Sequence, residues 1–224
     1  MDSFGQLDVA VTIRVYLLDD HALVRAGMRL ILEQEVDIQV VGEADTGEEA
    51  LPQIRRLKPD VVLCDLHLPG ISGLEVTERI SRTGLSNVVV VSVLEDGPLP
   101  RRLLDAGALG YMGKAGDPEE LVRAVRDVAR GRRYLGNAIA QNMALSTLER
   151  DRSPFEKLSP RELEVAMLLV QGVRQDEIAR RLSLSPKTIH THKARLFEKL
   201  QVRDPIALAR LASQYGLADS ARSV

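Results

Sequence analysis

Three acids, a serine and a lysine stand at the ends of separate apolar runs and could together perform phosphoryl chemistry. They are Asp19, Asp20, Asp65, Ser92 and Lys114. Each apolar run is short enough to predict a buried β-strand. Because ligands of an open parallel sheet bind at the carboxyl ends of its strands, we expect these side chains to converge. The set predicts a site for Mg²⁺-assisted phosphoryl transfer.

A role for each residue follows from the needs of phosphoryl transfer, in which position and charge supply most of the catalysis. Asp65 would be the nucleophile and form an aspartyl phosphate. Mg²⁺ prefers oxygen ligands, so Asp20 and Asp65 would bind it directly. Asp19 would act through water, and the backbone carbonyl of His67 would complete the protein's share. Lys114 would place a positive charge beside the phosphoryl oxygens.

The first half of the chain alternates short apolar strands with helices. Strands are expected at 13–18, 38–43, 61–64, 88–91 and 109–112, and helices at 22–33, 47–57, 73–82, 99–106 and 118–131. Strict alternation predicts an α/β fold with a doubly wound, five-stranded parallel sheet in the order 2-1-3-4-5. Pro118 after Asp117 is typical of a helix start, whereas Pro52 should kink or shorten its helix.

Beyond residue 133 the alternation stops and four closely spaced helices follow a looser segment. Their expected ranges are 160–171, 176–182, 186–200 and 204–215. A pair of helices joined by a short turn is the layout of a helix-turn-helix. We therefore predict a first domain at 12–133, a partly helical linker at 134–154, and an all-α four-helix domain at 155–217.

Composition and charge narrow the class of protein. Of the 224 residues 45% are hydrophobic and 28% charged, as in globular proteins, and one cysteine excludes an internal disulfide. The sequence shows no signal peptide and no apolar run near the ~20 residues that cross a bilayer. We expect a cytoplasmic protein with no membrane partner. Residues 153–224 hold 12 Lys and Arg against 8 Asp and Glu, which favours an anionic partner there.

The acid cluster and its companions resemble the receiver domain of two-component response regulators over about residues 12–133. The matching residues are Asp19, Asp20, Asp65, Pro69, Gly70, Ser92 and the run 110–114. The resemblance implies that Ser92 is a switch hydroxyl, which moves to bind a phosphoryl oxygen, and that Tyr111 is an aromatic residue that then swings inward. It also implies a cis peptide bond between Lys114 and Ala115.

The second domain resembles the LuxR/NarL-type helix-turn-helix, whose motif matches at 158–162, 178–182, 185–192 and 199–200. The expected helix at 186–200 is amphipathic, so one of its faces can meet a partner. The positions that the resemblance assigns to base reading are His190, Thr191 and Ala194. The positions that it assigns to DNA phosphates are Ser185, Lys187, Thr188, Lys193 and Arg195.

Within this family the chain is most similar to the GacA/UvrY group of global regulators, with further matches at 96–100, 102–104, 153–155 and 197–200. That similarity implies a sensor histidine kinase of hybrid type and control of small regulatory RNA promoters. The family's last helix, here 204–215, is a dimer contact, although core packing explains the same apolar residues. An active homodimer on two-fold sites in double-stranded promoter DNA is implied.

These features together predict a regulator that is phosphorylated on Asp65 by its kinase, then binds promoter DNA as a dimer and regulates transcription. It would not be an enzyme, apart from slow loss of its own phosphoryl group. One alternative is a phosphohydrolase, which typically carries a second acid where this chain has His67. Another is a constitutive DNA-binding protein whose first domain no longer takes phosphate. The intact acids and Lys114 argue against this second alternative.

Overall fold

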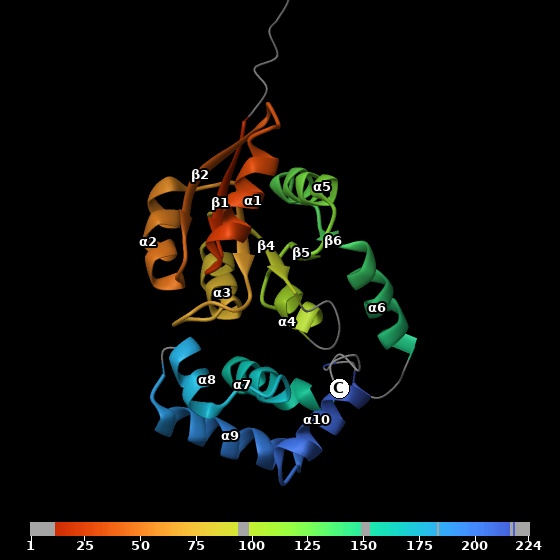
Figure 1. Ribbon diagram of the computed structural model, residues 1–224. Coiled ribbons are helices and arrows are strands. Elements are labelled where there is room, and N and C mark those ends of the chain that lie inside the picture. Colours follow the sequence, from red (N-terminus) through yellow and green to blue (C-terminus); the bar gives the residue numbers. More distant parts are fainter. Residues whose placement is uncertain (1–11, 94–98, 149–152, 183, 216, 218–224) are drawn as a thin grey trace, which may run out of the picture.

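The computed structural model describes residues 12–93, 99–148, 153–182, 184–215 and 217 (Figure 1). The strands are β1 (Ile13–Leu18), β2 (Ile38–Ala44), β3 (Val61–Asp65), β4 (Asn87–Ser92), β5 (Gly110–Gly113) and β6 (Tyr134–Leu135). The helices of the first domain are α1 (Ala22–Leu32), α2 (Gly47–Leu57), α3 (Gly73–Thr83), α4 (Leu99–Asp105) and α5 (Pro118–Ala129). The predicted alternation of strands and helices is confirmed.

The strands form one parallel sheet in the order β2-β1-β3-β4-β5-β6. The predicted order of the first five strands is confirmed, but the expectation of a five-stranded sheet is wrong by one strand. β6 lies at the start of the segment assigned to the linker, where the Tyr134 amide donates to the Leu109 carbonyl at 2.9 Å. A two-residue strand is too short to show periodicity, and its pairing exists only because β5 lies beside it.

Side chains of the central strands alternate between two apolar clusters, as the period of two in a strand requires. The cluster that packs on α1 and α5 contains Val15, Leu17, Val61, Leu63, Val89 and Val91. The cluster that packs on α2, α3 and α4 contains Tyr16, Leu18, Val62, Cys64, Val88 and Val90. Because both faces are covered, β3 is buried along its whole length, and Asp65 ends it at the edge of the core.

Local signals set most helix starts. Thr46, Ser72 and Asp117 each accept a backbone N–H of the first turn of α2, α3 and α5. These hydrogen bonds satisfy donors that a helix start otherwise leaves unpaired. α2 continues through Pro52 to Leu57, so the proline does not end the helix.

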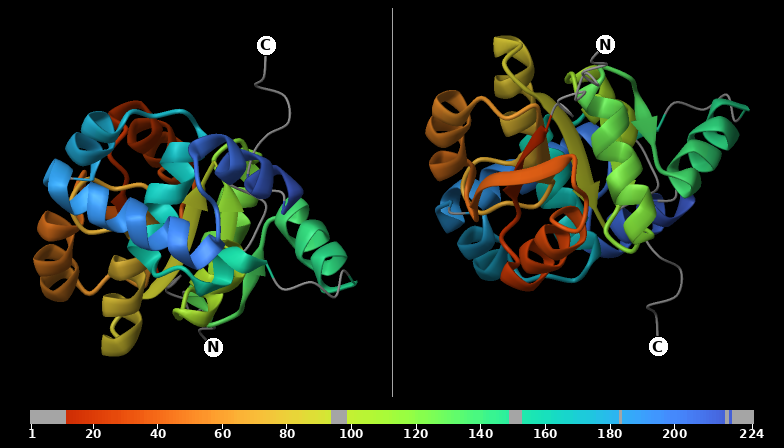
Figure 2. Two further views of the ribbon diagram at one scale, coloured as in Figure 1. Left: turned by 90° about the horizontal axis from the view of Figure 1, so that it is seen from below. Right: turned by 90° about the horizontal axis from the view of Figure 1, so that it is seen from above.

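The second domain is all helical, as predicted. The linker contains α6 (Asn137–Leu148), and the 3₁₀ turn η1 (Pro154–Lys157) leads into the second domain. The helices of the second domain are α7 (Pro160–Val170), α8 (Gln175–Arg181), α9 (Pro186–Leu200) and α10 (Pro205–Gln214). α7 and α8 lie between the sheet domain and α9 (Figure 1). α9 therefore lies on the side of the second domain that faces away from the sheet, in front in the view from below (Figure 2). Among the described residues no helix is long and apolar enough to span a membrane.

Candidate phosphoacceptor site and nucleic-acid interface

The sheet brings two of the predicted acids and the lysine into direct contact. Asp19 follows β1, Asp65 ends β3, and Lys114 follows β5, so the three residues come from three strand ends. The ammonium nitrogen of Lys114 lies 2.8 Å from Oδ2 of Asp65 and 2.7 Å from Oδ2 of Asp19. The two carboxylates are only 2% and 1% exposed. Two buried negative charges are therefore held together by one buried positive charge.

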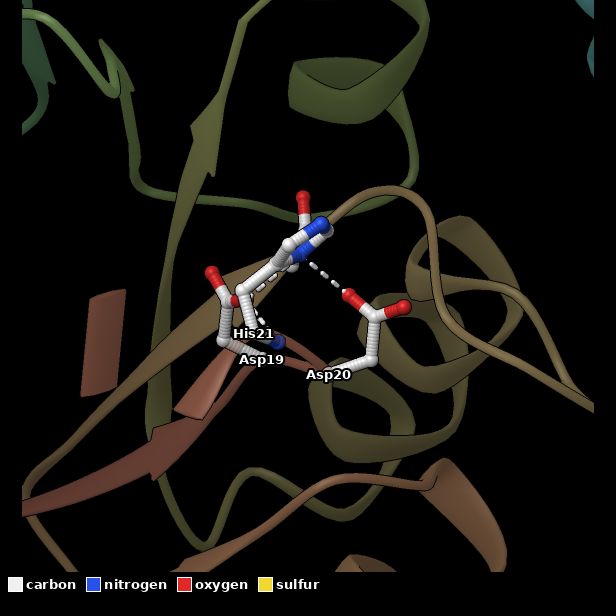
Figure 3. Close-up of side chains that lie close together, drawn as sticks. Asp19, Asp20 and His21 are labelled. Carbon is white, nitrogen blue, oxygen red and sulfur yellow. Dashed lines mark hydrogen bonds and ion pairs between the residues drawn. The ribbon is translucent and has the colours of Figure 1, made fainter. Parts of the chain in front are cut away.

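His21 joins this cluster, although the sequence analysis gave it no role. Its Nδ1 lies 2.6 Å from Oδ1 of Asp20 and 3.3 Å from Oδ1 of Asp19 (Figure 3). Its backbone N–H also donates to Asp19 at 2.8 Å. Its position directly after the acid pair is the signal that could have found it.

The cluster has the donor atoms of a metal site. One ligand atom each from Asp19, Asp20, His21 and Asp65 can be chosen so that all four lie within 4.8 Å of one another. Oδ2 of Asp19 is buried, and its ion-pair partner is the ammonium of Lys114 at 2.7 Å. Carboxylate oxygens are the donors that hard divalent cations prefer, so the residues present fit such an ion.

Burial controls the protonation of the two central groups. It raises the pKa of Asp65 to about 6, against the opposing effect of Lys114. For Lys114 burial acts to lower the pKa, but the carboxylates of Asp65 and Asp19 outweigh it and raise the pKa. At neutral pH the site therefore holds an ionised Asp65 beside a charged Lys114, the state that a nucleophilic carboxylate requires.

Of the remaining predicted residues of this site, Ser92 lies at the carboxyl end of its strand and Tyr111 lies within β5. Ser92 is fully buried at the end of β4, and its carbonyl accepts the N–H of Lys114 at 2.8 Å. Tyr111 pairs with Val90 across β4 and β5, and its ring is already fully buried. The switching roles of Ser92 and Tyr111 stay predictions, as does the role of the His67 carbonyl.

His67 and the peptide bond after Lys114 complete the description of this edge. Burial, together with the nearby Lys114, lowers the pKa of the His67 imidazole to about 4, so this ring is neutral at pH 7. The Lys114–Ala115 peptide bond is trans, and the expectation of a cis bond is wrong.

The candidate DNA-binding residues lie on one helix. α9 spans the residues predicted for it, and Ser185 caps it by accepting the N–H of Thr188 at 3.1 Å. Ile189, Leu196 and Leu200 are buried against the other helices. Of the residues assigned to DNA contact on α9, those exposed are Lys187, His190, Thr191, Ala194 and Arg195. Their spacing of three and four residues places them along one continuous face.

Three of the assigned residues, Thr188, Thr191 and Lys193, contact neighbouring groups of α9 or its cap. Thr188 is half-buried and shares a hydrogen bond of 2.8 Å with the Ser185 hydroxyl. The Thr191 hydroxyl donates to the Lys187 carbonyl at 3.0 Å, and Lys193 lies over the Phe197 ring, 5.4 Å from its centroid. Burial lowers the pKa of the neighbouring His192, which faces inward toward Arg161.

Comparisons with known proteins identify both domains. Residues 15–126 match the response regulator receiver domain, and residues 156–212 match the luxR family of bacterial regulatory proteins. The chain belongs to the response regulators. Its receiver domain is the sheet domain, and its LuxR-type DNA-binding domain is the helical one. Membership of this family argues against the phosphohydrolase alternative.

Similar proteins cover almost the whole chain. Response regulator GacA of Pseudomonas aeruginosa is 45% identical over 93% of this chain and 99% of its own length. Response regulator UvrY of Escherichia coli K12 is 44% identical over 93% of this chain and 97% of its own length. Among solved structures, promoter-bound RcsB from Salmonella enterica with phosphomimetic BeF₃⁻ is 28% identical, with a TM-score of 0.67. That match covers 91% of this chain and 99% of the RcsB chain.

Proposed function

We propose that Asp65 of this response regulator accepts a phosphoryl group from a sensor histidine kinase, and that this modification controls the binding of α9 to promoter DNA. The observation that carries the proposal is the contact of Lys114 with both Asp65 and Asp19 at the carboxyl edge of the sheet. These groups can hold the transferring phosphoryl group next to the one carboxylate that ends a buried strand.

In the proposed transfer, a carboxylate oxygen of Asp65 attacks phosphorus, and the bond from phosphorus to the donor's leaving atom breaks. Lys114 pairs with a phosphoryl oxygen, and the buried hydroxyl of Ser92 donates to another. Asp19 and Asp20, with Asp65 and the His67 carbonyl, would hold Mg²⁺. When bound, that ion neutralises charge on the phosphoryl oxygens. The acyl phosphate formed on Asp65, a mixed anhydride, would be lost slowly by hydrolysis, without further enzymatic activity.

The proposed response lies in the second domain. His190, Thr191 and Ala194 would read base edges in the major groove, where each base pair shows a distinct pattern. Ser185, Lys187, Thr188, Lys193 and Arg195 would bind phosphates and fix the register of α9. The active form would be a cytoplasmic homodimer on two-fold sites, and its kinase would be of the hybrid type that the GacA/UvrY similarity implies.

Intact mass after incubation with acetyl phosphate and Mg²⁺ tests the receiver chemistry. Wild type should gain one phosphoryl group only when Mg²⁺ is present, and Asp65→Asn should gain none. Asp45→Asn serves as the matched control, because Asp45 is an exposed acid after β2 and should leave the gain unchanged. A phosphoryl group that persists in Asp65→Asn would contradict the proposal.

The constitutive alternative has one observation in its favour, because the outer face of α9 is exposed while the two domains are packed together. Fluorescence anisotropy on promoter DNA separates the two functions. Phosphorylation should raise the affinity of wild type and leave Asp65→Asn unchanged. Equal DNA affinities for wild type and Asp65→Asn, each with and without phosphorylation treatment, would favour the constitutive DNA-binding protein.

A further inference from the structure

The loop that follows Asp65 contacts the second domain, and Arg161 makes a hydrogen bond across this contact. Arg161 lies in the first turn of α7, and its Nη2 donates to the Gly70 carbonyl of this loop at 2.6 Å. The same nitrogen donates to the Leu182 carbonyl at the end of α8, at 3.0 Å. Its Nη1 pairs with Glu164 at 2.8 Å. One guanidinium therefore links the receiver to the turn before α9.

The loop from Asp65 to α3 is tightly packed, so it can transmit a change at Asp65. A Cβ on Gly73, the first residue of α3, would lie 2.0 Å from the Asp65 carbonyl oxygen. The Gly73 N–H donates to the Leu66 carbonyl at 3.0 Å, and the Ile71 N–H donates to Glu48 at 3.0 Å. Because the backbone of Asp65 and the start of α3 are in contact, neither can move without the other.

A second contact ties the same loop to the same turn of α7. The Ser72 hydroxyl caps α3 by accepting the N–H of Glu75 at 3.2 Å, and it lies close enough to the Glu164 carboxylate to lower the pKa of that group. Glu164 is only 5% exposed. Both side chains that α7 sends across the domain boundary here, Arg161 and Glu164, therefore end on the loop between β3 and α3.

The other side of Arg161 faces the helix-turn-helix. Leu182, whose carbonyl it binds, is the C-cap of α8, from which the chain turns toward the Ser185 cap of α9. The positive charge of Arg161 also acts on His192 of α9, whose Nδ1 is buried and has no hydrogen-bond partner. A shift of Arg161 would thus change its hydrogen bond to Leu182, just before α9, and its electrostatic effect on His192 on the inner side of α9.

We propose that Arg161 is the positioning residue that couples phosphorylation of Asp65 to the orientation of the helix-turn-helix. This inference rests on the proposed function. The outer face of α9 stays exposed while Arg161 binds Gly70, so the coupling acts through the turn before α9 and not by covering its DNA-binding face. The bond to Gly70 is made while Asp65 is paired with Lys114. In the proposed coupling this bond is weaker in the phosphorylated arrangement, so it favours the unphosphorylated one.

Coupling between two sites is reciprocal, so a change at Arg161 that affects the helix-turn-helix should also change ligand affinity at Asp65, and this can be measured without DNA. The affinity of full-length protein for beryllofluoride, a phosphoryl analogue, is measured by ¹⁹F NMR with Mg²⁺ and no DNA. Arg161→Ala should bind beryllofluoride about fivefold more tightly than wild type, the lower end of usual coupling. A residue that only held the second domain together would leave affinity at Asp65 unchanged.

Two further variants keep the result interpretable. Arg180→Ala is the matched control, because Arg180 is an exposed residue of α8 that pairs with Glu177 of its own helix. It should bind beryllofluoride as wild type does. Arg161→Lys keeps the charge, but an ammonium cannot reproduce the guanidinium fork, so a smaller gain is expected. This variant decides the question if thermal melting shows that Arg161→Ala is partly unfolded.

Anisotropy on promoter DNA supplies the second measurement. The ratio of DNA affinities with and without beryllofluoride should fall toward one in Arg161→Ala. If neither this ratio nor the beryllofluoride affinity differs from wild type, the inference is overturned and the proposed function stands. Wild type that fails to bind beryllofluoride would remove both.

Discussion

The phosphoacceptor site and the outer face of α9 use charge in opposite ways. At the first, two carboxylates that are nearly inaccessible to water share the ammonium of Lys114. On the second, Lys187 and Arg195 are exposed to water along one helix. Buried charges are costly to gather and hold each other in place, whereas exposed ones cost little and stay available to an anionic partner. Substitutions should therefore affect folding at the first site and binding at the second.

Removing the buried cation should have the largest effect. Lys114→Met leaves Asp19 and Asp65 buried without their partner, so we expect the free energy of unfolding to fall by about 3 kcal/mol at neutral pH. Urea unfolding in metal-free buffer measures the loss, with Lys58→Met as the exposed control. A variant as stable as wild type would mean that the carboxylates carry no buried charge.

Replacing a base-reading residue should give the next largest effect, and only on DNA. His190→Ala should weaken binding to the specific promoter about tenfold while leaving binding to random DNA nearly unchanged. His190 is exposed, so unfolding should not change. Anisotropy titrations on both DNA sequences provide the measurement, and equal losses on the two would exclude His190 from base reading.

A phosphate contact should behave differently from a base contact. Lys187→Ala should weaken binding to every DNA sequence and reduce the slope of log affinity against log salt by about one. Its effect on unfolding should stay within about 0.5 kcal/mol, because Lys187 is exposed. An unchanged salt slope would show that Lys187 does not displace counterions from DNA.

The buried acid between the two regions should show the smallest effect. Burial raises the pKa of Glu164, against the opposing effects of Arg161 and Ser72 and with a further increase from Glu75. An acid with a raised folded pKa destabilises the protein as pH rises above its unfolded value of about 4.5. Glu164→Gln should therefore gain stability relative to wild type between pH 4.5 and pH 8. Thermal melting of both proteins across that range measures this gain. A difference in melting temperature between Glu164→Gln and wild type that does not change with pH would contradict the predicted sign.

Local patterns predicted much of the fold and every residue of the acid cluster except His21. The bounds of β3 and β4 lie within one residue of those predicted and the bounds of α9 agree, because apolar runs and capping residues act over a few neighbours. β6 was missed because two residues show no pattern. His21 was missed because a histidine after two acids has many ordinary roles.

The sequence by itself determined which residues carry charge and on which elements they lie. The acids follow apolar strands, and the bases recur along one face of α9, since periodicity is written in the chain. The convergence of Asp19, Asp65 and Lys114 was expected, but only the tertiary structure shows that one ammonium contacts both carboxylates. It alone also shows that Arg161 of the second domain contacts Gly70 of the first. Contacts between residues 49 or 91 positions apart depend on how the elements pack, and no local pattern encodes that.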